Sequence, residues 1–357
     1  RHMMDETKNG MPLSRRSMLA GTGALALAPL GGQAATAAER CIVGTWGGDY
    51  ARLLRENIDT PLLVPTGVEV TQSVSDEAPR LAQMFAKRML PRGTLDIACL
   101  GSFNGYRAAS SGLLETLDTT KGPNLKYVAP DLRSGSFMPD QFVPHIYSPQ
   151  VLAYNPNTVK TPPTTWAELL EPRWKGKVGV QAATAVWVIM GAAQATAGNP
   201  NAFDSAKEYL LKLNANGLRL YAETDAIAPA FKSGEIDVAV IWLARTIMWR
   251  NAGFPVRGSF PKEGAIAYVS GMVMPKNAPD KDGAYKYMNA LLDPSAQRGF
   301  AAHMGYLPTV SNALLTGKVA DDLALPAGAK LVQPDYPMIA KESPALNDWW
   351  LKNIARK

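Results

Sequence analysis

The chain has 357 residues, of which 46% are hydrophobic and 19% charged, and its formal net charge is +6. This composition is typical of a globular protein of about two domains and excludes a fibrous or disordered chain. Lys and Arg never form a run of five or more, which makes nucleic acid a poor candidate partner. A basic protein still favours anionic or zwitterionic ligands over polycations.

Residues 1–38 predict an export signal that is removed from the mature protein. Ser14-Arg15-Arg16-Ser17 leads into the apolar residues 18–30, and a Gly- and Ala-rich run follows. Paired arginines before a short apolar segment indicate the twin-arginine route, by which folded proteins cross into the periplasm. The apolar run is too short for a membrane span, which needs about 20 residues. A buried N-terminal helix is the alternative.

The mature chain alternates short strand-like runs with helical patterns. Strands are expected at residues 42–45, 68–72, 95–100, 178–180, 218–220 and 236–242, and helices at residues 50–57, 78–89, 106–114 and 201–214. Such alternation predicts an α/β fold with two units on mostly parallel sheets. The Pro-rich residues 122–156 predict an extended, turn-rich crossing between the units, and the apolar run 265–274 predicts a crossing back. Ligand is then expected in a cleft at the carboxyl ends of the strands.

Two cysteines are present, and the sequence leaves their state open. Cys41 and Cys99 both lie in short apolar runs that are typical of strands. An oxidising periplasm permits a disulfide between them, whereas the strict geometry of a disulfide makes two buried free thiols equally acceptable.

Four phrases of the sequence resemble the spermidine/putrescine-binding branch of the ABC-importer binding proteins. They are Tyr154-Asn155 with residues 162–178, then residues 233–238 with Ile241-Trp242, and residues 261–264 and 304–309. The resemblance implies a two-lobed periplasmic binding fold of the second type, a hinge that closes over one solute, a membrane permease as partner, a monomer and no cofactor. Residues 40–145 with 269–357 are expected to form the first lobe, and residues 146–268 the second.

One of these phrases also has a local physical explanation. Thr164 or Thr165 is suited to cap a helical turn that begins at Trp166-Ala167-Glu168, and Gly176 is suited to end the next turn. This segment is therefore expected to be scaffold.

The resemblance further implies that aromatic side chains and a few polar groups from both lobes hold the solute. The aromatic positions are Trp46, Phe103, Trp242, Tyr268 and Tyr306, and the other positions are Gly47, Gly48, Ser102, Gln181, Thr184, Asp225 and Ser270. The two glycines would let a ligand approach backbone N–H groups at a helix start, although a tight turn alone also explains them. Core filling is the alternative for each aromatic residue.

The departures from the family pattern point to a different ligand. Ser270 and residues 181–185 stand where the polyamine binders carry carboxylates, and a buried ammonium without a charged partner costs several kcal/mol. Arg245 follows Trp242 by three residues and is suited to bind a carboxylate or phosphonate, with a surface salt bridge as the alternative. Asp225 is a candidate partner for an amino group. The prediction is a zwitterion such as an amino acid or ω-amino acid, or a small organic anion, with a polyamine as the alternative.

Three further polar residues are weaker candidates for the site. They are Arg80, Arg133 and His145, and for His145 a structural place near the crossing is the preferred interpretation.

Other functional classes fit the sequence less well. A secreted hydrolase would need a Gly-x-Ser-x-Gly or His-Glu-x-x-His motif, and neither occurs; beyond His2, only His145 and His303 are available for catalysis. The chain is therefore not expected to be an enzyme. A ferric-iron binder is disfavoured because adjacent tyrosines are absent from the sequence. A partner of a membrane receptor, using the same fold for sensing, stays open.

Overall fold

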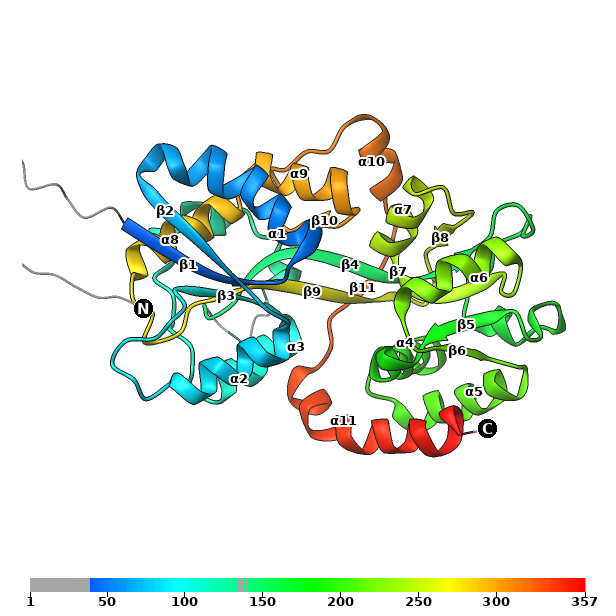
Figure 1. Ribbon diagram of the computed structural model, residues 1–357. Coiled ribbons are helices and arrows are strands. Elements are labelled where there is room, and N and C mark those ends of the chain that lie inside the picture. Colours follow the sequence, from blue (N-terminus) through cyan, green and yellow to red (C-terminus); the bar gives the residue numbers. More distant parts are fainter. Residues whose placement is uncertain (1–38, 134–137, 139, 357) are drawn as a thin grey trace, which may run out of the picture. The chain divides into compact units, whose positions relative to one another are not determined.

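The computed structural model describes residues 39–133, 138 and 140–356, so the expected export signal lies outside the described residues. The fold is α/β, as predicted, and it contains two α/β units joined by two long strands (Figure 1). The first unit has three parallel strands in the order β2-β1-β3. Its elements are β1 (Glu39–Thr45), α1 (Gly48–Leu54), β2 (Val68–Val74), α2 (Glu77–Lys87), β3 (Ile97–Gly101) and α3 (Ser102–Ser110).

The second unit repeats this arrangement with the strand order β7-β5-β6, again parallel. Its elements are β5 (Val178–Gln181), α4 (Ala185–Ala197), α5 (Phe203–Ala215), β6 (Arg219–Tyr221), α6 (Ile227–Ser233), β7 (Val238–Trp242), α7 (Leu243–Asn251) and the short β8 (Arg257–Ser259). Each unit has its own hydrophobic core: one cluster includes Val43, Ile97 and Phe300, and another includes Val180, Val188 and Leu210.

Two strands carry the chain between the units. Strand β4 (Val143–Tyr154) pairs with β9 (Ala265–Val273) through its first half and with β7 through its second half, in both cases antiparallel (Figure 1). The expectation of mostly parallel sheets therefore holds within each unit but not at the junction. The reason is that β4 carries the chain from the first unit to the second and β9 carries it back, so these two strands run antiparallel.

The predicted turn-rich connection is wrong over residues 143–154, where β4 is a continuous and almost fully buried strand despite Pro144 and Pro149. Proline lacks an N–H and is normally confined to edges or irregular positions of a sheet. Here the pairing register shifts between Pro144 and Ile146. Opposite Pro144 lies Gly271, where a Cβ atom would stand 2.1 Å from the carbonyl oxygen of Val143, so only glycine permits this approach.

The C-terminal segment contacts both units. It comprises α8 (Lys281–Leu291), α9 (Pro294–Met304), β10 (Leu307–Pro308), α10 (Gly317–Leu323), β11 (Leu331–Val332) and α11 (Tyr336–Trp350). Helix α11 begins with Tyr336 in the core of the first unit, whereas Leu346 and Trp350 lie in the core of the second. The assignment of all of residues 269–357 to the first lobe stays a prediction, and at the end of α11 Leu346 and Trp350 join the core of the second unit.

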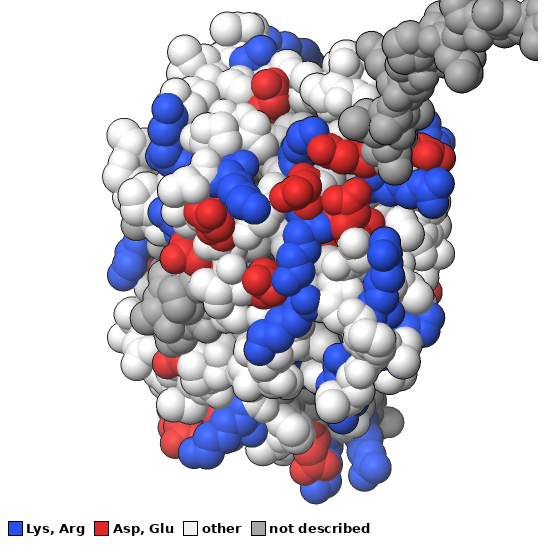
Figure 2. Space-filling view, turned by 90° about the vertical axis from the view of Figure 1, so that its left-hand side faces the viewer, with Lys and Arg blue, Asp and Glu red and all other residues white. Residues whose placement is uncertain are grey.

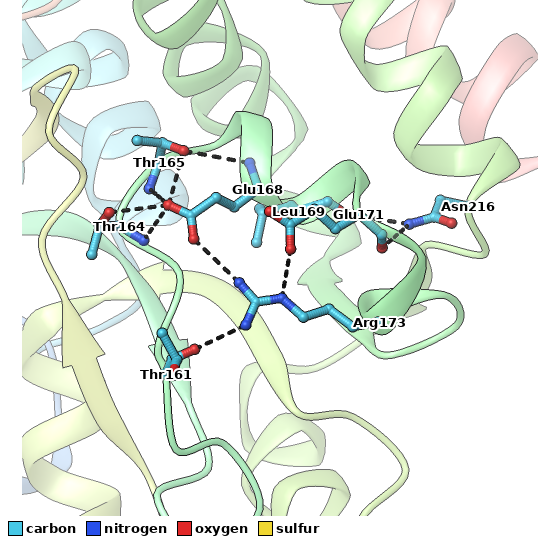
Figure 3. A network of polar contacts seen from close by, with 8 residues as sticks. All are labelled: Thr161, Thr164, Thr165, Glu168, Leu169, Glu171, Arg173 and Asn216. Atoms are coloured by element: carbon cyan, nitrogen blue, oxygen red, sulfur yellow. Dashed lines mark hydrogen bonds and ion pairs between the residues drawn. The ribbon is translucent and has the colours of Figure 1, made fainter.

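The segment expected to be scaffold forms a capped helical turn (Figure 3). Thr165 Oγ1 accepts a hydrogen bond from the backbone N–H of Glu168 (3.4 Å), while a carboxylate oxygen of Glu168 accepts from the N–H groups of Thr164 (3.0 Å) and Thr165 (3.1 Å). This reciprocal pattern is a capping box. Arg173 holds the other oxygen of Glu168 at 3.3 Å and also pairs with Glu171 at 2.6 Å. The polar side chains that cap this turn are thus used in local contacts.

Both cysteines are buried free thiols. Strand β1 pairs with β3 so that Val43 lies opposite Ile97 and Gly44 opposite Ala98, which puts Cys99 opposite Thr45. Cys41 therefore lies four residues before Thr45, the residue opposite Cys99, and this distance is roughly 13 Å along the strand. This separation exceeds the span of a disulfide. Burial also raises the pKa of Cys99 to about 11, so that thiol stays protonated.

The charged surface is mixed in sign. Figure 2 shows Lys and Arg side chains interspersed with Asp and Glu on the face that it presents, without a continuous positive tract. Ion pairs such as Lys281–Glu115 (2.8 Å) and Arg40–Glu69 (3.7 Å) join opposite charges. Across the described residues, no helix has both the length and the apolar character that a membrane crossing requires.

Candidate functional site

A cavity of about 300 Å³ lies beside the crossing strands, and it is named the Arg245 cavity after its cation. Its lining combines residues from both units: Trp46, Tyr50, Ile146, Arg245, Tyr268, Ser270, Met304 and Tyr306. Trp46 follows the carboxyl end of β1, and Tyr268 and Ser270 lie two residues apart on β9, where alternate side chains share one face. Five predicted ligand residues therefore converge here, namely Trp46, Arg245, Tyr268, Ser270 and Tyr306.

Arg245 is the third residue of α7, which begins directly after β7. It is half-buried, and it makes no ion pair or hydrogen bond with any residue that the structure describes. The surface salt bridge considered as its alternative role is thus absent from that part of the chain. Arg250, farther along the same helix, contrasts with it by pairing with Asp322 at 2.5 Å. Burial raises the pKa of Tyr306, and the nearby positive charge of Arg245 opposes this rise.

The wall formed by Trp46 is supported from behind by Arg80. The Arg80 guanidinium lies 5.1 Å from the centroid of the Trp46 ring, and the Tyr50 ring meets the same indole edge-on at 5.0 Å. Arg80 is 1% exposed and donates to the carbonyl oxygens of Cys99 (3.0 Å) and Ser75 (2.7 Å). Burial lowers its pKa. Arg80 therefore fixes the position of an aromatic wall and does not itself line the cavity.

Tyr50 connects the cavity to the crossing strand β4. Its hydroxyl group is 2.8 Å from Nδ1 of His145, which is fully buried, and the carbonyl oxygen of His145 accepts from Gln297 at 2.8 Å. Burial lowers the pKa of His145 to about 3. A neutral imidazole therefore anchors the tyrosine, which agrees with the structural role expected for this histidine.

Trp242, a predicted ligand residue, lines neither cavity but packs against aromatic rings that do. It lies 5.6 Å from Tyr268 and 5.2 Å from Trp187, measured between ring centroids, and Trp187 lies 5.9 Å from Tyr268. These three residues, the aromatic trio, are in mutual contact. Trp187 was not predicted, because a tryptophan in the apolar helix α4 is indistinguishable from core in the sequence.

A second cavity of about 200 Å³ lies on the other side of this contact, between α3, α4 and α11, and is named the α11 cavity. Its lining is mostly apolar and consists of Phe103, Ala183, Val186, Trp187, Met190, Pro334, Tyr336, Ile339, Ser343 and Asn347. The predicted ligand residue Phe103 therefore belongs to this cavity and not to the Arg245 cavity.

The remaining predicted residues line neither cavity. Ser102 is buried at the start of α3, and its hydroxyl has no partner among the described residues. Gln181 accepts from Thr224 at 2.6 Å, and Thr184 donates to the Gln181 carbonyl oxygen at 2.8 Å, so both are used locally. Asp225 is exposed in a short helical turn.

The two glycines and Arg133 also lie away from the cavity linings. Gly47 and Gly48 are exposed, and Gly48 has a φ of +61°, which favours glycine and supports the tight-turn alternative. Arg133 pairs with Asp140 at 3.0 Å.

Acidic side chains are absent from the lining of the Arg245 cavity. The charge of one carboxylate, Glu77, adds to the rise that burial causes in the pKa of the lining residue Tyr268. One oxygen of Glu77 already accepts hydrogen bonds from the N–H of Gly101 and the amide of Asn104, both at 2.8 Å. Among the described residues, no three His, Cys, Asp or Glu side chains gather closely enough to hold a metal ion.

Comparison with known families identifies the class of this fold. The family model of the bacterial extracellular solute-binding proteins matches residues 65–327, which is well over half of the chain. The chain belongs to this family. It is the solute-binding component of an ABC transporter, and proteins of this kind bind small molecules and interact with a membrane permease. The resemblance inferred from the four sequence phrases is thereby confirmed.

Individual relatives of this solute-binding protein differ in ligand. The spermidine/putrescine-binding periplasmic protein of Escherichia coli (strain K12) is 28% identical over 279 residues, which cover 75% of this chain and 78% of the relative. A Salmonella typhi protein, named as a candidate 2-aminoethylphosphonate-binding periplasmic protein, is 31% identical over 169 residues, 43% of this chain and 48% of that protein. The structure described as the Atu4243-GABA receptor has a TM-score of 0.75 at 22% identity, covering 89% of this chain and 99% of that one. These matches support the two-lobed periplasmic binding fold.

Proposed function

We propose that this solute-binding protein captures a small solute with a carboxylate or phosphonate group, either a zwitterion such as an amino acid or ω-amino acid or a simple organic anion. The observation that carries this proposal is the half-buried Arg245, which lines a cavity without an acidic residue and has no ion-pair partner among the described residues. Arginine offers paired N–H donors whose geometry matches a carboxylate or phosphonate. The buried hydroxyl group of Ser270, which lines the same cavity, adds one more polar contact.

A polyamine fits this cavity less well. Each ammonium group that leaves water needs a carboxylate or several acceptors in the protein, and the lining supplies no carboxylate. Arg245 would in addition repel a cation placed beside it. The name of the Salmonella typhi relative refers to an aminophosphonate, which supports a zwitterionic ligand.

The proposed mechanism is closure of two lobes about the crossing strands β4 and β9. Trp46 and Tyr306 adjoin the core of the first unit, whereas Arg245 lies on α7 of the second. A ligand that contacts both sides stabilises the closed state and shifts an existing equilibrium between open and closed forms. The permease then recognises the closed form, and no chemical step takes place. Ligand contacts of the five predicted residues that line the Arg245 cavity, export by the twin-arginine route, and a monomeric state belong to the same proposal.

A thermal-shift screen of the mature chain tests the ligand class. The compounds are amino acids, ω-amino acids, small carboxylates, phosphonates, polyamines and ferric salts. A ligand that binds only the native state adds about 2.7 kcal/mol of stability at a hundredfold excess over Kd, which raises the midpoint by several degrees. We expect the shift with carboxylates, phosphonates or zwitterions. A shift confined to putrescine, spermidine or ferric ion would overturn the proposal.

A further inference from the structure

The Arg245 cavity and the α11 cavity are separated by a contact between aromatic rings. Tyr268 belongs to the lining of the first cavity and Trp187 to that of the second, and their ring centroids are 5.9 Å apart. Trp242 touches both rings, at 5.6 Å from Tyr268 and 5.2 Å from Trp187. Rings at these separations are in van der Waals contact, which leaves no passage for a ligand between them.

We propose that Trp187 determines ligand length by closing the Arg245 cavity on the side of α11. The inference rests on the proposed function of the Arg245 cavity and adds an upper limit to the size of its ligand. At about 300 Å³, this cavity is at the lower end of the range for small-molecule sites. A ligand whose anionic group is held by Arg245 therefore cannot extend toward Phe103 and Met190, because the ring contact blocks that side.

The backbone that carries Trp187 is held firmly against a crossing strand. The carbonyl oxygen of Trp187 accepts a hydrogen bond from the amide of Gln150 on β4, at 3.3 Å. One helical turn later, Gly191 faces the same strand, and a Cβ atom there would lie 2.2 Å from Oε1 of Gln150 and 2.6 Å from the ring of Trp166. Glycine at this position thus lets α4 approach β4 closely. The backbone of Trp187 is consequently held in place, and its indole packs against the rings of Trp242 and Tyr268.

The two cavities also differ in chemistry. The Arg245 cavity has a cation and tyrosine hydroxyl groups, whereas the lining of the α11 cavity contains no charged side chain. Removal of the indole would therefore connect an anion-binding end to an apolar end. The joined space would suit a longer molecule with one anionic terminus and an apolar chain, a class that the native protein rejects.

The experiment compares native protein with Trp187→Ala and Trp187→Leu. Calorimetric titration measures the affinities for the ω-amino acids β-alanine, γ-aminobutyrate, ε-aminocaproate and ω-aminoundecanoate, and for the carboxylates butyrate and decanoate. Trp349→Ala, which removes a half-buried indole from α11 outside both cavity linings, is the matched control. Circular dichroism of each variant verifies folding.

We expect native protein and the Trp349→Ala control to bind the short ligands and to lose affinity steeply as the chain lengthens. Trp187→Ala should bind the longest ligands at least about tenfold more tightly than native protein, and Trp187→Leu, which keeps part of the apolar volume, should fall between them. The same dependence on chain length in native protein and both Trp187 variants would overturn the inference while leaving the proposed function intact. Failure of native protein to bind any of the six compounds, together with a negative screen, would overturn both.

Discussion

Replacing Arg245 by glutamine separates ligand binding from stability. The substitution keeps a long polar side chain on α7 but removes the charge. Hydrogen bonds to charged groups contribute about 1.5–3 kcal/mol, so the affinity for a carboxylate ligand should fall by about 10- to 150-fold. Because Arg245 has no ion-pair or hydrogen-bond partner among the described residues, the free energy of unfolding without ligand should change by less than about 0.5 kcal/mol.

Arg250→Gln, on the same helix, is the matched control. Arg250 pairs with Asp322 at 2.5 Å, and Lys318 pairs with the same carboxylate at 2.6 Å. Loss of this partly exposed pair should lower the free energy of unfolding by up to about 1 kcal/mol, and it should leave ligand affinity unchanged. The two variants are thus expected to show opposite patterns.

Affinity is measured by calorimetric titration with the ligand from the screen, and stability by urea unfolding of the ligand-free protein. An Arg245→Gln protein that keeps its affinity within about threefold would remove Arg245 from the site. A loss of more than about 2 kcal/mol in its free energy of unfolding would instead show that Arg245 supports the fold.

Two further predictions concern charge and protonation near the cavity. Ser270→Asp should weaken binding of a carboxylate ligand by more than about tenfold, because it adds a negative charge to the lining. Ser270→Asn introduces a side chain of the same shape as Asp but without the charge, so it should weaken binding much less. Equal titration curves for the two variants would contradict this explanation. His145 has a pKa lowered to about 3 in the folded protein. In the unfolded chain it takes up a proton below about pH 6.5, so acidification through this window should destabilise the native protein. Between pH 7 and pH 5, the free energy of unfolding from urea titrations should fall by about 2 kcal/mol more in native protein than in His145→Gln. Parallel pH profiles would show that His145 titrates normally.

The sequence was sufficient for the class of fold and for part of the site. Alternating strand and helix patterns predicted two α/β units because the periodicity of apolar residues reports which face of each element is buried. The aromatic and polar ligand positions, by contrast, were implied by the resemblance to the family and not by periodicity. Of these positions, Trp46, Tyr268 and Tyr306 line the Arg245 cavity.

Sequence reasoning failed where a side chain serves a purpose that its local pattern does not reveal. Tyr50 and Met304 lie within or at the end of helices, and Ile146 lies in a segment that was taken for a turn-rich connection. Their patterns are those of core residues. Phe103 was expected beside the ligand. Because α3 begins at Ser102, directly after β3, Phe103 is already a helical residue, and it lines the α11 cavity instead.

The sequence by itself determined the family, the alternation of elements and the absence of the polyamine-type carboxylates, because each is written in local residue patterns. Only the tertiary structure decided which side chains meet. The register of β1 and β3 separates Cys41 from Cys99, and the crossing of β4 and β9 brings Arg245 to Tyr268. The contact of Trp187 with Tyr268 joins residues far apart in the chain. Such contacts depend on how elements pack and in which register strands pair, and local periodicity does not record either.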